Sequence, residues 1–242
     1  MCSKLIFTSD TAKHHPNIIH GFARANDDAN GSTNKYKSIL LDLGIPDFKY
    51  HTVNQVHKAT VMVVDGKRDT SHIQADAMVT TIPGLLLCIK TADCAPILLF
   101  EPKAQVVAAI HAGWSGAYNG VVTNTIAAMI KLGANKDAMV ACIGPTIQQQ
   151  SYEVDENFKE RFCTQNPQAK QFFVDGKPGH YFFDLPGYCT SQLRTAGVGT
   201  IDDSRIDTYS NELLYSYRRS THQGYTGPVL NQVSAIAIAK AE

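Results

Sequence analysis

The sequence predicts an α+β fold, with mixed layers of helices and strands around one core. The first half of the chain carries short apolar runs rich in valine, isoleucine and leucine, a pattern typical of buried strands. The second half carries segments with apolar residues at helical spacing. The chain shows no internal repeat, heptad or linker-like tract, so we expect a single domain over residues 1–242.

Five apolar runs predict buried strands, because each run is continuous rather than alternating. The turn Glu101–Lys103 is too short to hold a crossover helix, which predicts antiparallel pairing of neighbouring strands in this region. The five runs are Val61–Val64, Ala77–Thr80, Leu85–Ile89, Pro96–Phe100 and Val106–Ile110.

Three segments predict helices. Gly120–Leu132 has apolar residues at helical spacing, and Asp155–Phe162 is a shorter segment of the same kind. Leu185–Ala196 follows Asp184, an expected N-cap, and Gly197 just past its end is a typical stop signal.

Three further strands are predicted at Ala138–Ile143, Tyr181–Phe183 and Ser234–Ala239, the last with weak alternation. The segment Asn26–Lys37 is polar and contains glycine, so we expect a mobile loop there.

Composition excludes several classes of function. The 22 basic and 22 acidic residues give a net charge of zero, which does not favour nucleic acid or an anionic membrane as a partner. No apolar run approaches the roughly 20 residues of a membrane helix, and Met1–Asn17 lacks the apolar core of a secretion signal. The six cysteines form no Cys-x-x-Cys pair, which favours reduced thiols and a cytoplasmic location.

Three polar segments lie at the edges of predicted strands and contain metal-ligand side chains: Asn54–His57, Thr91–Pro96 and His111–Trp114. Two imidazoles and one thiolate, from His57, Cys94 and His111, suit a catalytic zinc ion, because three protein ligands leave a fourth tetrahedral position open. Without further information a buried cysteine or a lone histidine is more often a core or hydrogen-bonded residue. Asp93 either orients a ligand or forms a turn beside Pro96.

Several motifs together resemble one protein family, the YfiH-type proteins, which carry the older label of multicopper polyphenol oxidase or laccase-like domain. The motifs occur in the same order as in the family, and the resemblance covers roughly His20 to Ala239, nearly the whole chain. They are Asn54–His57, Asp76–Thr80, Thr91–Pro96, His111–Trp114, Ile143–Pro145 with Tyr152–Val154, and Ser216–Arg219.

The resemblance implies a YfiH-like fold, also likened to the cytotoxic necrotising factor hydrolases, and a metal, usually zinc, on His57, Cys94 and His111. It implies phosphorolysis of adenosine, inosine, guanosine and methylthioadenosine, with adenosine deamination as a companion activity. The chain departs from the family pattern at Ser115, Ser220 and Pro228, where the resemblance implies a basic residue, an aspartate and an arginine respectively.

Purine nucleoside and phosphate are thus the expected small-molecule partners. Arginine binds phosphate at two points, so Arg24 and either Arg218 or Arg219 are phosphate candidates, although an exposed arginine is often only a surface residue. Trp114 either stacks on a base or packs in the core. Asn54 and Gln55 complete the expected substrate residues.

Deamination needs a proton donor, for which Asp93 or a histidine is a candidate. The expected catalytic residues are thus Cys94, His57, His111 and Asp93.

Three alternative functions remain open. Copper accepts the same ligands and would allow phenol oxidation, but the nine histidines include no His-x-His pair of the multicopper kind. A metal-free hydrolase would use Cys94 as nucleophile and His111 as base, acting on cell-wall peptide precursors. A non-catalytic nucleoside-binding protein is the third alternative, and the oligomeric state is not predicted.

Overall fold

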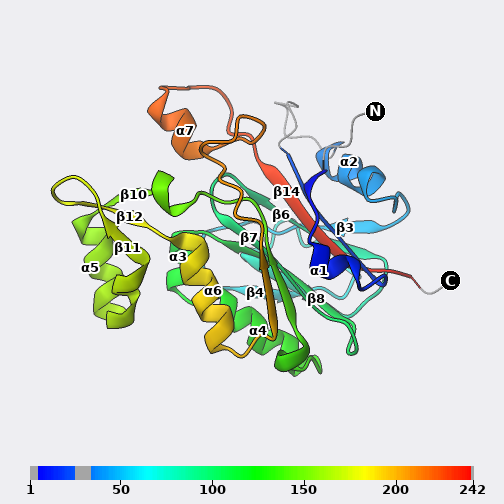
Figure 1. Ribbon diagram of the computed structural model, residues 1–242. Helices are drawn as coiled ribbons and strands as arrows, with labels where there is room; N and C mark the ends of the chain where they lie inside the picture. The colour runs from blue at the N-terminus through cyan, green and yellow to red at the C-terminus, as the bar shows by residue number, and fades with distance from the viewer. Residues whose placement is uncertain (1–4, 25–33, 241–242) are drawn as a thin grey trace.

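The computed structural model describes residues 5–24 and 34–240, which form three β-sheets and the helices that cover them (Figure 1). The first sheet has the order β1 (Leu5–Phe7), β2 (Ile18–Ala23), β14 (Gln232–Ile238), β6 (Leu85–Thr91) and β3 (Lys49–His51). The second has the order β13 (Thr200–Asp203), β9 (Val140–Ile143), β7 (Ala95–Glu101), β8 (Val106–Ala112), β5 (Ala77–Thr80) and β4 (Val61–Val63). The third is small, with the order β10 (Glu153–Asp155), β12 (His180–Phe183) and β11 (Phe173–Asp175).

The helices are α1 (Asp10–Lys13), α2 (Asn34–Asp42), α3 (Trp114–Tyr118), α4 (Val121–Lys131), α5 (Glu156–Gln165), α6 (Leu185–Thr195) and α7 (Tyr217–His222). Among the described residues, no helix is both long and apolar enough to cross a bilayer.

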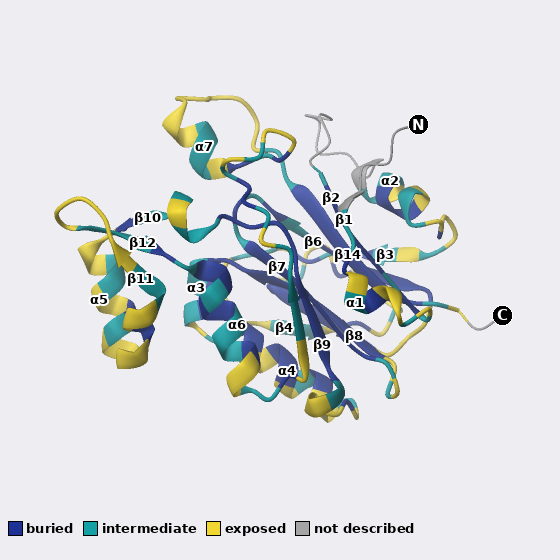
Figure 2. Cartoon of the chain, in the orientation of Figure 1, coloured by how far each residue is buried: buried dark blue, intermediate teal, exposed yellow. Residues whose placement is uncertain are grey.

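The two large sheets pack face to face, and each carries helices on its other face (Figures 1 and 2). Alternate residues of β7 show this: Leu98 and Phe100 belong to the core between the sheets, whereas Ile97 and Leu99 belong to the core under α4 and α6. A strand with helices on one face and a sheet on the other is buried on both faces. This double burial explains why the strand runs are continuous in apolar residues.

The three predicted helices are confirmed as α4, α5 and α6, but α5 begins one residue after Asp155, which was predicted inside it, and continues to Gln165. Asp184 accepts a hydrogen bond from the backbone N–H of Gly187 at the start of α6 (2.8 Å), and Gly197 follows its end at φ 86°. Asp155 likewise caps α5 through the N–H of Phe158 (2.8 Å). Each cap satisfies a backbone donor that the first helical turn leaves unpaired.

Strand pairing differs in part from the expectation. β7 and β8 are antiparallel as predicted, but β4 runs parallel to β5 because residues 64–76 are long enough to return the chain to the same edge. β6 lies in the first sheet and does not pair with β7, which follows it directly in sequence.

Three element boundaries also need correction. The strand predicted at Ala138–Ile143 starts at Val140, after a 3₁₀ turn at Lys136–Ala138. The closing strand starts at Gln232 and is buried along its whole length, since it lies centrally between β2 and β6. Of the predicted loop Asn26–Lys37, the last four residues form the first turn of α2, and the remainder lies outside the described residues.

Candidate metal centre and substrate pocket

The side chains of His57, Cys94 and His111 converge, with their ligand atoms all within 4.8 Å of one another. Cys94 and His111 meet because β7 and β8 form a hairpin whose register pairs Ala95 with Ala112. His57 comes from the loop before β4 and lies edge-on to His111, with 4.7 Å between ring centroids. Two imidazoles and a thiolate at this spacing suit a tetrahedral metal ion.

The backbone around the three side chains is strained in a way that typically marks a functional site. His57 has φ 57° and Asp93, next to Cys94, has φ 83°, both in the left-handed region that non-glycine residues rarely adopt. Gly113 has no such φ but has no room for a side chain. A Cβ there would lie 2.9 Å from the Cys94 sulfur and 3.1 Å from Cδ2 of His57. Glycine at 113 therefore lets the sulfur and the imidazole approach each other, and the site fits a metal ion.

Asp76, which sequence reasoning left without a role, holds two parts of this site in place. Its Oδ1 lies 2.8 Å from Nδ1 of His111, and its side chain is fully buried. The same carboxylate accepts backbone N–H bonds from Val56 (3.3 Å), His57 (2.9 Å) and Lys58 (2.7 Å). Asp76 thus orients one ligand ring and fixes the loop that carries the other, as acidic partners of metal-binding histidines do. The signal in the sequence was an acidic residue directly before the apolar run Ala77–Thr80.

The charges at the centre favour a thiolate. Burial alone would raise the pKa of Cys94, but the charge of His111 and hydrogen bonds from both histidines lower it to about 6. Burial likewise opposes protonation of His111, yet Cys94 and the Asp76 carboxylate raise its pKa to about 9. By contrast, burial raises the pKa of Cys142 to about 12. A thiolate is the form that binds metal and the form that acts as a nucleophile.

The three side chains open into a cavity of about 540 Å³, a size that suits a nucleoside-like molecule. The expected residues Asn54, Gln55, Asp93, Trp114 and Arg218 all line it. Its other lining residues are Lys90, Ala92, Ile147, Tyr152, Leu185, Tyr217, Val229 and Asn231.

Lys90 is the most important residue that sequence reasoning missed here. The Gln55 amide pairs with the Lys90 backbone like a neighbouring strand, donating to its carbonyl (2.7 Å) and accepting from its N–H (2.8 Å). Among the described residues, the Lys90 ammonium forms no ion pair or hydrogen bond. Gln55 therefore holds the backbone of Lys90, whose ammonium group lines the cavity. Both polar atoms of the Gln55 amide are engaged in these two hydrogen bonds.

The two adjacent arginines have different roles. Arg219 donates to the backbone carbonyls of Thr208, Tyr209, Asn211 and Leu214, so it holds the segment before α7 together. Arg218 lines the cavity and makes one guanidinium hydrogen bond to a described residue, the carbonyl of Glu153 (2.7 Å). Its remaining donors can reach a ligand.

Asp93 lies at the cavity but its two oxygens are both occupied. Oδ1 accepts from the Thr208 hydroxyl (2.6 Å) and Oδ2 from the backbone N–H of Arg218 (2.7 Å). Asp93 therefore connects the Cys94 segment to the segment that carries Arg218.

Trp114 lines the cavity and also packs against Phe158, at 5.2 Å between ring centroids. Arg24 follows the end of β2 and is not among the lining residues, so the structure does not bring it to this cavity. Ser115, Ser220 and Pro228 also lie outside the lining.

Comparison with known proteins identifies the family and the fold of this chain. The model of the family described as multi-copper polyphenol oxidoreductase laccase matches residues 17–237. The chain belongs to this family. The YfiH protein of Bacillus licheniformis, a solved structure, covers 93% of this chain and 94% of its own, with a TM-score of 0.81 and 25% identity. YlmD of Geobacillus stearothermophilus covers 99% of this chain and 100% of its own, with a TM-score of 0.83 and 21% identity, which confirms the fold.

Relatives of this family carry an enzyme name. A purine nucleoside phosphorylase of Rickettsia conorii is 38% identical over 172 residues, which cover 70% of each protein. A purine nucleoside phosphorylase of Mycobacterium bovis is 35% identical over 182 residues, which cover 75% of this chain and 72% of the relative. The expected YfiH-type family and its mixed α/β fold are therefore confirmed.

Proposed function

We propose that this protein is a zinc-dependent purine nucleoside phosphorylase acting on adenosine, inosine, guanosine and methylthioadenosine, with adenosine deaminase activity in the same cavity. The observation that carries the proposal is that Lys90 and Arg218 share one cavity with Cys94 and its two histidines. Two cations beside a metal centre suit a reaction between phosphate and a neutral nucleoside.

In phosphorolysis, a phosphate oxygen bonds to the anomeric carbon while the bond to the purine breaks, and the purine leaves with a proton. Lys90 and Arg218 would hold the phosphate, since neither is neutralised by a carboxylate among the described residues. The Asp93 carboxylate accepts hydrogen bonds from the Thr208 hydroxyl and the Arg218 backbone N–H, and forms no ion pair with either cationic group.

The purine would lie against the aromatic part of the wall. Tyr217 is 57% exposed and lines the cavity, and Trp114 and Tyr152 line it too. Within the described part of the chain, the Asn231 amide makes one long hydrogen bond (3.4 Å, to the Val229 carbonyl), which leaves it available for the purine edge.

Zinc on His57, Cys94 and His111 would supply a Lewis acid beside the substrate. The described residues offer this one group of three metal-ligand side chains, which favours a single ion over a multicopper centre. Asp76 would keep Nδ1 of His111 protonated, so that Nε2 faces the ion. In deamination a water oxygen adds to the purine carbon, and the amino group takes up a proton and leaves as ammonia.

Product analysis tests the proposal. Metal-defined protein is incubated with adenosine, with and without phosphate, and adenine, ribose 1-phosphate, inosine and hypoxanthine are separated by chromatography. We expect phosphate-dependent adenine and ribose 1-phosphate, lost in Cys94→Ala and retained in the control Cys163→Ala, whose cysteine lies on α5 away from the cavity. Absence of any purine product at every zinc loading would overturn the proposal.

A cysteine hydrolase is the second candidate, because Asp76, His111 and Cys94 are arranged as the acid, base and nucleophile of such an enzyme. It would act on cell-wall peptide precursors. Metal-free protein distinguishes the two, since a hydrolase keeps its activity after chelation and loses it on alkylation of Cys94, whereas the proposed phosphorylase loses activity on chelation.

A further inference from the structure

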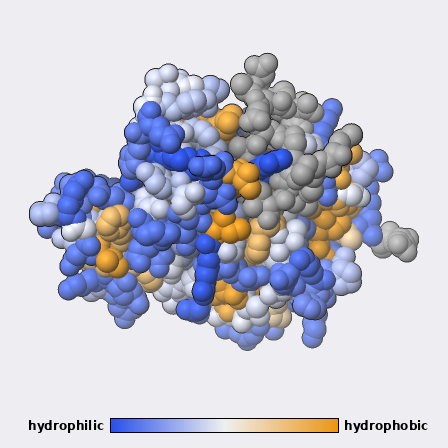
Figure 3. All heavy atoms as spheres, turned by 45° about the horizontal axis from the view of Figure 1, so that its top comes forward, coloured by the Kyte–Doolittle hydropathy of each residue, from blue (hydrophilic) through white to orange (hydrophobic). Residues whose placement is uncertain are grey.

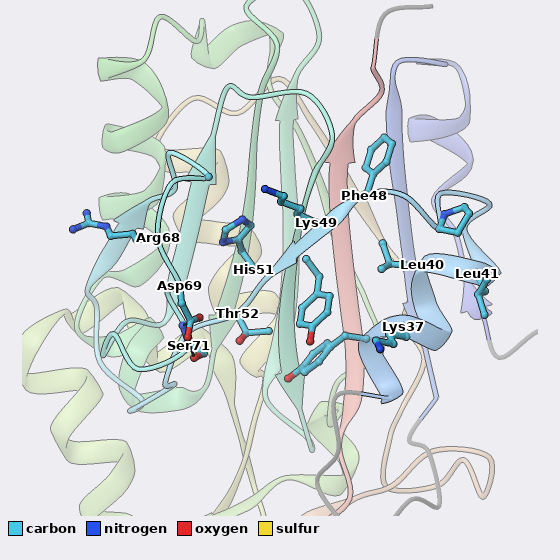
Figure 4. Close-up of a pocket in the computed structure, with 14 residues that line it drawn as sticks. Lys37, Leu40, Leu41, Phe48, Lys49, His51, Thr52, Arg68, Asp69 and Ser71 are labelled. Atoms are coloured by element: carbon cyan, nitrogen blue, oxygen red, sulfur yellow. Dashed lines mark hydrogen bonds between the residues drawn. The ribbon is translucent and has the colours of Figure 1, made fainter.

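A second and larger cavity, of about 940 Å³, follows the edge strand β3 and shares no lining residue with the metal cavity (Figure 4). We call it the β3 groove. α2 and the loop before β3 form one wall, and the loop between β4 and β5 forms the other. It is lined by Tyr36, Lys37, Leu40, Leu41, Pro46, Phe48, Lys49, Tyr50, His51, Thr52, Gly66, Arg68, Asp69 and Ser71.

The α2 side of the groove is apolar and aromatic. The rings of Tyr36 and Tyr50 stack at 5.0 Å between centroids with an angle of 21°. Phe48 lies at the same side of β3, and Leu41 is 66% exposed there (Figure 4). Stacked tyrosines beside open apolar surface suit a flat ring.

The opposite side is polar and positively charged. Lys49 and Arg68 line it, and neither forms an ion pair with another described residue. The Asp69 carboxylate is already bound by Ser71, through its N–H (2.9 Å) and its hydroxyl (2.8 Å). With Lys37, the groove has three cations and one engaged carboxylate, so it favours an anion.

His51 provides an unused polar group between the two sides. Its side chain is 8% exposed, and its Nε2 atom has no hydrogen-bond partner among the described residues. Burial lowers the pKa of His51, so the ring is neutral near pH 7 and can donate or accept. A buried polar atom without a partner is uncommon in folded proteins and typically has a functional explanation.

We propose that the β3 groove binds a nucleoside monophosphate, with the base against Tyr36 and Tyr50 and the phosphate at Lys49, and with Arg68 on the loop between β4 and β5 adding positive charge at the far wall (Figure 4). Lys49 and Tyr50 are adjacent on β3 and Tyr36 stacks on Tyr50, so the aromatic pair and one cation stand close together on this strand. This site is independent of the metal cavity and of the reaction proposed for it.

Calorimetric titration with AMP, run alongside tryptophan fluorescence, tests the proposal. Trp114 is the only tryptophan and lies in the metal cavity, so its fluorescence reports binding there and not in the β3 groove. We expect AMP to bind with a calorimetric signal that persists in Arg218→Met, in which binding at the metal cavity is weakened.

The double variant Lys49→Glu/Arg68→Glu should weaken this signal at least tenfold, because two of the three groove cations are replaced by groups that repel the phosphate. Both side chains are exposed, so the fold should tolerate the change. The control Lys131→Glu/Lys170→Glu makes the same change in charge at exposed lysines away from both cavities and should bind AMP normally. Adenosine and inorganic phosphate should each bind the groove at least tenfold more weakly than AMP.

Three outcomes would overturn the proposal. The first is that, in Arg218→Met, the calorimetric signal for AMP is lost together with the change in Trp114 fluorescence, which would place AMP in the metal cavity. The second is unchanged AMP affinity in Lys49→Glu/Arg68→Glu. The third is inorganic phosphate binding as tightly as AMP, which would remove the role of the tyrosine pair.

Discussion

The Asp76 carboxylate lies 2.8 Å from Nδ1 of His111 and also accepts the backbone N–H of His57. One buried side chain thus orients two of the three proposed metal ligands, which lie 35 and 19 positions away in the sequence. The integrity of the centre should therefore depend on a residue that does not itself bind the metal.

Asp76→Asn should lower zinc affinity by about 10- to 100-fold, the usual effect of removing such a partner. The amide cannot accept all the N–H groups that the carboxylate accepts, so stability should also fall by about 1–3 kcal/mol. Competition with a chelating dye measures the affinity. The control Asp47→Asn, at an exposed position, should change neither quantity. Equal zinc affinity in Asp76→Asn and the parent would contradict this role.

Gly113→Ala should displace the metal ligands, because the added methyl group would lie 2.9 Å from the Cys94 sulfur. Gly133→Ala is the matched control: its Cβ meets open space, but its φ of 97° makes the substitution strained. We expect Gly133→Ala to lose about 1 kcal/mol of stability and keep its zinc, whereas Gly113→Ala loses zinc. Zinc content and urea unfolding separate the two effects.

Lys90→Met and Arg218→Met should each raise KM for phosphate at least tenfold, because each removes a cation from the cavity wall. Deamination of adenosine in phosphate-free buffer should change much less. Steady-state kinetics of phosphorolysis and of deamination measure the two effects separately. A uniform loss of both activities would instead indicate damage to the whole cavity, and Lys131→Met serves as the surface control.

The protein should lose stability as the pH is lowered, because His20 takes up a proton more readily in the unfolded chain than in the folded one. Burial, with Lys13 adding to the effect, lowers the pKa of His20 to about 4, and its Nε2 accepts the backbone N–H of Ser9 (2.9 Å). The unfolded chain takes up a proton near pH 6.5 and the folded chain only near pH 4, so stability is lost as pH falls between these values. The loss through this residue reaches roughly 3 kcal/mol.

Urea unfolding of the parent and of His20→Gln at pH 7 and pH 4.5 measures this loss. The glutamine oxygen can still accept the Ser9 N–H but does not titrate, so the variant should lose less stability between the two pH values. Equal losses in the two proteins would assign the acid sensitivity to other groups.

Several features of the site follow from local sequence signals. The three proposed metal ligands stand at the edges of apolar runs, so these candidates could be chosen without a structure. Lys90 gave no such signal, because its exposure to the cavity depends on the Gln55 amide 35 positions earlier. Arg24 carried the expected chemistry but lies beyond the cavity lining.

From the sequence alone, most of the buried strands and the three longest helices could be predicted, because these depend on neighbouring residues and on the apolar pattern along one segment. The short helices α1, α3 and α7, the helix α2 and the strand β2 were not predicted. The folded structure was needed to show that β6 and β7 enter different sheets, that Asp76 reaches His111, and that Tyr36 stacks on Tyr50. An apolar run reports that a strand is buried on both faces, but the partner on each face is set by packing between distant segments. Contacts of that kind leave no periodic trace in a single sequence.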